Sequence, residues 1–104
     1  MPIPRKPLAT FRAAVNERGE RLRKLKFEEL KRLAVPTEYL TIESRPATID
    51  VIVQPSPTGG GIRVVIQGFL KAKLIGKDVA LDGFYKYPDE TITPMTREEF
   101  YEFD

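Results

Sequence analysis

The strongest indication of the fold is the strand pattern at residues 62–74, IRVVIQGFLKAKL. Every second residue from Ile62 to Leu70 is apolar or glycine, which is the pattern of a strand with one buried face. Val65 and Phe69 place apolar side chains on the opposite face. Because both faces carry apolar residues, we expect this strand to lie centrally in a sheet.

Further strand patterns lie on both sides of this segment. Residues 48–54 alternate between polar and apolar positions, and the following PSPTGGG at 55–61 is typical of a loop. A turn at 76–78 leads to a strand at 79–87, and after a turn at 88–89 residues 91–93 form either a short strand or an extended segment. These short connections predict an antiparallel meander of three to four strands.

Helical patterns occupy both ends of the chain. Residues 8–34 contain no proline and place Leu8, Phe11, Val15, Leu22 and Leu33 on one line of an amphipathic helix. Gly19 costs this helix about 1 kcal/mol relative to alanine, so a break between Gly19 and Lys26 is an alternative to one continuous helix. TREE at 96–99 has the spacing of a capping box and predicts a short C-terminal helix.

The predicted fold is a single small α+β domain over residues 1–104. We expect a flexible, basic, Pro-rich tail at 1–7, a basic helical segment at 8–34 and an acidic, strand-rich body at 35–104. The apolar stripe of the helix suits packing on one face of the antiparallel sheet.

The composition excludes several kinds of chemistry. The chain contains neither cysteine nor histidine, which removes disulfides, thiolate nucleophiles, cysteine metal sites and histidine acid–base catalysis. We therefore expect no cofactor, no metal and no catalytic activity. No stretch approaches the roughly 20 apolar residues of a membrane span, and we take a cytoplasmic location as the default. A carboxylate-based hydrolase would require Asp50 and Asp82 to face one pocket.

Charge is distributed unevenly along the chain. Residues 1–34 hold ten basic and four acidic side chains, a net charge of +6, whereas residues 35–104 hold seven and eleven, a net charge of −4. On a helical projection the basic groups straddle the apolar stripe, with Arg18 and Arg21 on one flank and Arg12, Arg23 and Lys26 on the other. These five residues are candidates for binding a partner.

Several interpretations of this basic helix remain open. Glu17–Arg21, Glu20–Lys24 and Glu28–Arg32 have the i to i+4 order of favourable ion pairs, which predicts a solvated and self-paired helix. The flanking charges also suit docking on the protein's own sheet, on a partner protein, or on an anionic membrane. Nucleic-acid binding through the helix, with Arg5 and Lys6 of the tail, is a further alternative. A phosphate backbone favours one continuous basic stripe, however, whereas the basic residues here lie on two flanks of the helix.

Six of the ten aromatic residues fall in the last twenty-one positions. Tyr85, Tyr87 and Tyr101 are candidate partner-binding residues, since tyrosine is frequent at interfaces. The alternative is that these rings hold a short C-terminal segment against the preceding strand. The favoured function is a non-catalytic protein-interaction or structural module that binds a protein partner or a second copy of itself.

Overall fold

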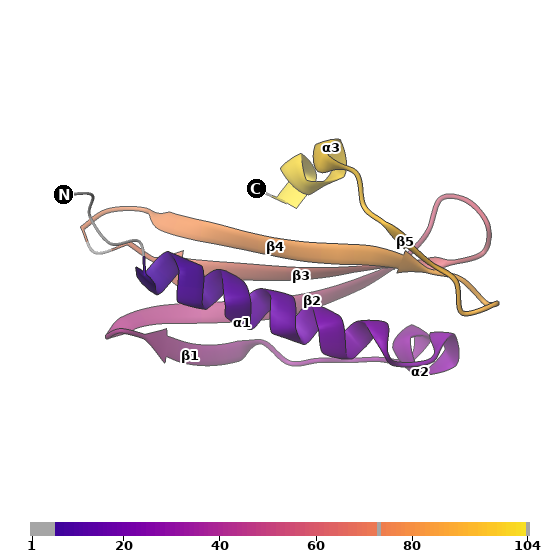
Figure 1. The fold of residues 1–104 in the computed structure, drawn as a ribbon, viewed down its shortest axis with the longest axis horizontal. Coiled ribbons are helices and arrows are strands. Elements are labelled where there is room, and N and C mark those ends of the chain that lie inside the picture. Colours follow the sequence, from indigo (N-terminus) through magenta and orange to yellow (C-terminus); the bar gives the residue numbers. More distant parts are fainter. Residues whose placement is uncertain (1–5, 73, 104) are drawn as a thin grey trace.

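The computed structural model describes residues 6–72 and 74–103. The fold is α+β, with a long helix on one face of an antiparallel sheet (Figure 1). The elements in chain order are α1 (Lys6–Arg23), α2 (Phe27–Lys31), β1 (Glu38–Ile42), β2 (Arg45–Pro55), β3 (Ile62–Lys71), β4 (Lys77–Lys86), β5 (Ile92–Pro94), α3 (Arg97–Phe100) and the 3-10 turn η1 (Tyr101–Phe103).

The sheet is a five-stranded meander in the order β1-β2-β3-β4-β5, with every neighbouring pair antiparallel. The expectation of three to four strands is therefore wrong. The strand that the sequence patterns did not predict is β1. It is only five residues long and has two half-buried positions, Leu40 and Ile42. Its alternation of apolar and polar residues is therefore too short to be recognised. It joins β2 through a tight turn in which Glu43 and Ser44 both have positive φ.

β3 is the central strand of the sheet, as predicted, and each of its faces carries buried apolar residues. Val64 and Ile66 are fully buried beneath α1, and Val65 is fully buried on the opposite face. The helix approaches β3 closely at Gly68, where an added Cβ would lie 2.6 Å from the Phe11 ring. The core therefore sits between α1 and the middle strands of the sheet.

The helical segment breaks between Arg23 and Phe27, within the predicted range. The buried Lys86 ammonium donates a hydrogen bond to the Arg23 carbonyl (3.2 Å) and thereby closes the end of α1. The Glu90 carboxylate lies 3.5 Å from Lys86 and accepts a hydrogen bond from the Phe27 N–H at the start of α2 (3.0 Å). The junction of the two helices is thus anchored to the end of β4.

The predicted tail is partly wrong. Residues 1–5 lie outside the described part of the chain, but Lys6 and Pro7 form the start of α1. A proline fits the first turn of a helix, because the N–H that it lacks would have no intrahelical partner there. Within the described ranges, no helix is long and apolar enough to cross a bilayer.

Candidate functional site

Arg18 binds the sheet on one flank of α1. Its Nε donates a hydrogen bond to Glu38 Oε1 on β1 (2.7 Å), and its Nη2 pairs with the second oxygen of the same carboxylate. This bidentate contact raises the pKa of Arg18 and lowers that of Glu38. Arg18 therefore holds the helix to the β1 edge of the sheet.

Arg23 forms the equivalent contact on the other flank of α1. Its Nη1 and Nη2 atoms donate to the two carboxylate oxygens of Asp82 on β4, at 2.7 and 2.9 Å. The guanidinium also lies 4.8 Å from the centre of the Phe84 ring, and the bond to Asp82 is the main cause of the raised Arg23 pKa. The predicted placement of Arg18 and Arg23 on opposite flanks is confirmed, and both arginines contact the protein's own sheet.

The geometry of Asp82 removes the carboxylate pair that the hydrolase hypothesis needs. Asp82 pairs in register with Ile66 on the face beneath α1, whereas Asp50 pairs with Gln67 on the opposite face. Asp50 instead accepts a hydrogen bond from the Thr37 hydroxyl. Two carboxylates on opposite faces of a sheet cannot flank one substrate.

The self-pairing predicted for the helix is confirmed at one of three positions. Arg21 Nε lies 2.8 Å from Glu17 Oε1, and both side chains are exposed. The described contacts include neither Glu20–Lys24 nor Glu28–Arg32, because α1 ends at Arg23 and α2 ends at Lys31. The Lys26 side chain is exposed, and its backbone N–H donates to Glu29 at the start of α2 (3.0 Å).

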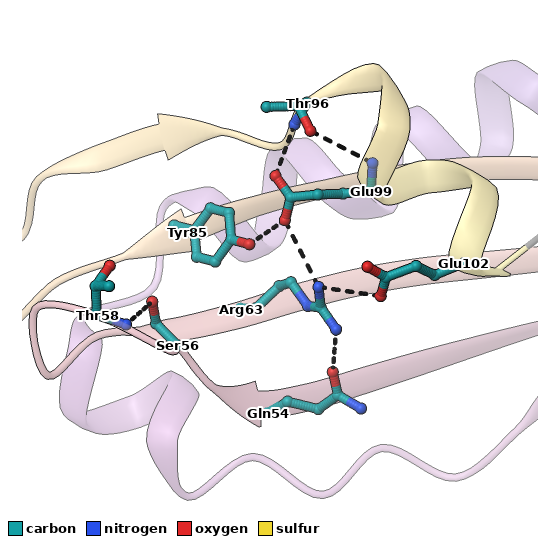
Figure 2. Close-up of polar contacts among 8 residues, drawn as sticks. All are labelled: Gln54, Ser56, Thr58, Arg63, Tyr85, Thr96, Glu99 and Glu102. Atoms are coloured by element: carbon teal, nitrogen blue, oxygen red, sulfur yellow. Dashed lines mark hydrogen bonds and ion pairs between the residues drawn. The ribbon is translucent and has the colours of Figure 1, made fainter.

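Tyr85 is part of a polar network that fixes the C-terminal segment (Figure 2). Its hydroxyl donates to Glu99 on α3, whose carboxylate also accepts from the Thr96 N–H (2.9 Å) and lies 3.6 Å from Arg63 Nη1. The Thr96 backbone bond and then the Tyr85 bond lower the pKa of Glu99, while burial followed by the bond to Glu99 raises that of Tyr85. Arg63 also binds Gln54 (2.7 Å).

Tyr87 also has a contact within the fold. Its ring covers the glycine-rich loop before β3, and a Cβ added at Gly61 would lie 2.5 Å from Tyr87 Cδ1. Tyr85 therefore holds the C-terminal segment in place, which agrees with the second of the two interpretations drawn from the sequence, whereas Tyr87 contacts the loop before β3. Tyr101, in contrast, is 67% exposed.

Arg12 and Tyr101 both line a cleft between α1 and α3. We call this hollow of about 420 Å³ the β4 cleft, because the middle of β4 forms its floor. Figure 1 shows β5 beside only the last part of β4, with α3 following as the chain turns back along that strand. The cleft is lined by Arg12 and Asn16 of α1, Val79, Ala80 and Leu81 of β4, Arg97 and Phe100 of α3, and Tyr101.

The floor of the β4 cleft is an open strand edge. The Tyr87 N–H donates to the Thr91 carbonyl (3.0 Å), so the backbone groups of Tyr87 point to the side of β4 on which β5 lies. Backbone groups alternate in direction along a strand, and Val79 and Leu81 lie an even number of residues before Tyr87. Their N–H and C=O groups therefore point to that same side. β5 covers this side only from Phe84 onward. Between the open part and β5, the Gly83 carbonyl accepts a hydrogen bond from Arg23 Nη2 (3.3 Å). Within residues 6–72 and 74–103, no group hydrogen-bonds to Val79 or Leu81 across this edge.

The charge of the β4 cleft is positive. Arg12 and Arg97 line it from two different helices, and no carboxylate among the described residues lines it. Neither arginine forms an ion pair with the described part of the chain. No group of three acidic side chains in that part could hold a metal ion. The chemistry that this arrangement offers is backbone pairing beside two guanidinium groups.

Comparison with known proteins supplies no further assignment, because no protein-family model, curated protein or solved structure matches the chain.

Proposed function

We propose that this protein is a non-catalytic interaction module that binds an extended, acidic segment of a partner protein in the β4 cleft. The observation that carries this proposal is the open edge at Val79 and Leu81, which lies between Arg12 and Arg97. An unpaired strand edge is a template for another strand, and protein modules bind extended peptides by adding them to such edges.

Each part of the cleft contributes a different component of binding. The free N–H and C=O groups of β4 pair with the peptide backbone, which supplies affinity that depends little on sequence. The two guanidinium groups select acidic side chains, since arginine binds carboxylates in a bidentate manner. Phe100 and Tyr101 provide an apolar wall for alternate side chains of the added strand.

The helix arginines give less support to nucleic-acid binding. Arg18 and Arg23 are engaged with Glu38 and Asp82, so neither guanidinium is free to neutralise a phosphate without giving up a contact to the sheet. Arg5 lies outside the described residues. A partner with an acidic peptide segment needs only the cations that already line the cleft.

A peptide titration tests the proposed function. The probe is a fluorescein-labelled decapeptide of alternating valine and glutamate, and its control replaces every glutamate with lysine. We expect saturable binding of the acidic peptide alone, measured by fluorescence anisotropy. The double variant Arg12→Gln/Arg97→Gln should weaken binding about tenfold, because two ion pairs of up to ~1 kcal/mol each are lost.

Matched controls separate the cleft from general charge effects. Arg21→Gln/Lys24→Gln removes two exposed cations at the C-terminal end of α1 and should leave binding unchanged. Methylation of alternate backbone nitrogens in the probe should abolish binding by removing the strand pairing. Equal losses in both double variants, or binding of labelled oligothymidine in preference to the acidic peptide, would contradict the proposal.

A further inference from the structure

The tip of the hairpin between β3 and β4 carries two unusually exposed apolar side chains. Leu74 is 93% exposed and Ile75 is 91% exposed, whereas the other exposed large hydrophobic residues of the described chain range from 38% to 79%. The two residues are adjacent in sequence and lie in the turn itself. They add nothing to the core and remain in contact with water.

The base of this hairpin is held in place. The Ala72 N–H donates to the Gly76 carbonyl (3.0 Å), and Gly76 has a φ of 84°, which favours glycine. Arg45 on β2 donates through Nε to the Lys71 carbonyl (2.7 Å) and through Nη2 to Asp78 (3.1 Å). The hairpin lies at the end of the sheet away from α2 (Figure 1). The apolar tip is thus presented outward from a fixed base.

The charges beside the tip are mainly positive. Lys71 and Lys77 are exposed and occupy the two strands directly below it. The acidic residue of the hairpin, Asp78, is paired with Arg45. Glu43 lies in the neighbouring turn between β1 and β2, at the same end of the sheet. Lys77 Nζ lies 4.1 Å from the centre of the Phe69 ring, which positions this cation on the outer face.

We propose that this hairpin docks the protein on the surface of an anionic lipid bilayer. Leu74 and Ile75 enter the boundary between the headgroups and the acyl chains, while Lys71 and Lys77 contact anionic headgroups. An apolar tip beside cations matches the two layers of such a surface, because apolar burial and headgroup attraction act together.

Tryptophan fluorescence tests the insertion directly. The chain contains no tryptophan, so Leu74→Trp introduces a single reporter at the tip. We expect its emission to shift to shorter wavelength on addition of vesicles of phosphatidylcholine with 30% phosphatidylserine, and to stay unchanged with phosphatidylcholine alone. Ile92→Trp, on β5 at the other end of the sheet, is the matched control and should show no shift. A tip reporter that does not respond to anionic vesicles would overturn the proposal.

Vesicle co-sedimentation measures the contribution of each part of the hairpin. Leu74→Ser/Ile75→Ser should reduce partitioning at least tenfold, whereas Val35→Ser, at another exposed apolar residue, should not. Lys71→Gln/Lys77→Gln should reduce it about fivefold for each lysine removed, compared with no change in Lys31→Gln on α2. Partitioning that is insensitive to both hairpin variants, or equal on neutral vesicles, would refute lipid docking. Acidic-peptide binding should be unchanged in the serine variant, so failure of this proposal is distinguishable from failure of the β4 cleft.

Discussion

Arg23 on α1 and Asp82 on β4 form a two-point ion pair in the space that Gly19 leaves beside the helix. A Cβ at Gly19 would lie 1.8 Å from Asp82 Oδ2, so the carboxylate occupies the position of the missing side chain. Arg18 and Glu38 form the corresponding pair on the opposite flank. The basic helix is therefore bound at both flanks by its own sheet, which accounts for two of its five candidate cations.

The Gly19 contact predicts an unusual response to alanine. In a solvent-exposed helix, Gly→Ala raises stability by about 1 kcal/mol. Here we expect Gly19→Ala to lower the free energy of unfolding by about 1–3 kcal/mol, because the added methyl group displaces the Asp82 carboxylate. Urea denaturation measures the effect. In an Asp82→Ala background the same change should be neutral or stabilising, and a higher stability of Gly19→Ala alone would contradict the described packing.

Gly68 allows the other close approach between α1 and the sheet. Gly68→Ala places a methyl group 2.6 Å from Phe11 Cζ and 2.8 Å from Val15 Cγ2, both in fully buried residues. We expect a loss of about 1–3 kcal/mol in the free energy of unfolding from this overpacking. Phe11→Leu should cost less in the Gly68→Ala background than in the wild type. Thermal or urea unfolding of the four proteins of this cycle tests the coupling, and strictly additive losses would argue against the contact.

Glu99 predicts a specific pH dependence of stability. Hydrogen bonds from Thr96 and Tyr85 lower its pKa in the folded protein. A carboxylate with a lowered folded-state pKa stabilises the protein above its unfolded pKa of about 4.3, and this contribution is lost as the pH falls through the folded value. Glu99→Gln should therefore reduce stability at pH 7, and its difference from the wild type should shrink at pH 3.

The neighbouring Glu98→Gln is the matched control for that pH series. The Glu98 side chain is exposed and forms no hydrogen bond or ion pair with the described residues. Its replacement should leave the pH profile close to that of the wild type. If Glu98→Gln and Glu99→Gln had the same profile in urea unfolding, the hydrogen bonds of Thr96 and Tyr85 to Glu99 would not be the origin of the effect.

The fold was largely predictable because its strongest pattern is local. The alternation at 62–70 with apolar residues on both faces identifies β3 as central, and the helical projection separates Arg18 from Arg23 correctly. β1 was not predictable in the same way. Its assignment depends on pairing with β2, a tertiary interaction, and its five residues carry little periodic signal.

The candidate site was predicted only in part. Arg12 and Tyr101 were identified as single residues, but Asn16, Arg97 and Phe100 join them only when α1 and α3 reach the same edge of β4. One signal was present in the sequence, because a strand at 79–87 is longer than the three residues at 91–93 that pair with it. That mismatch implies an open edge, although it does not show which side chains surround the edge.

Amide hydrogen exchange at Val79 and Leu81 tests the β4 cleft most directly. Ile42 pairs with Arg45 across the two-residue turn at Glu43 and Ser44, so the backbone groups of Ile42 and Leu40 face β2. The N–H groups of Tyr39 and Thr41 therefore point outward on the β1 edge and provide the internal control. With the acidic valine–glutamate peptide at saturation, NMR should show slower exchange at Val79 and Leu81 and unchanged exchange at Tyr39 and Thr41. Protection at Tyr39 and Thr41 instead, or unchanged exchange at Val79 and Leu81, would contradict strand addition at β4.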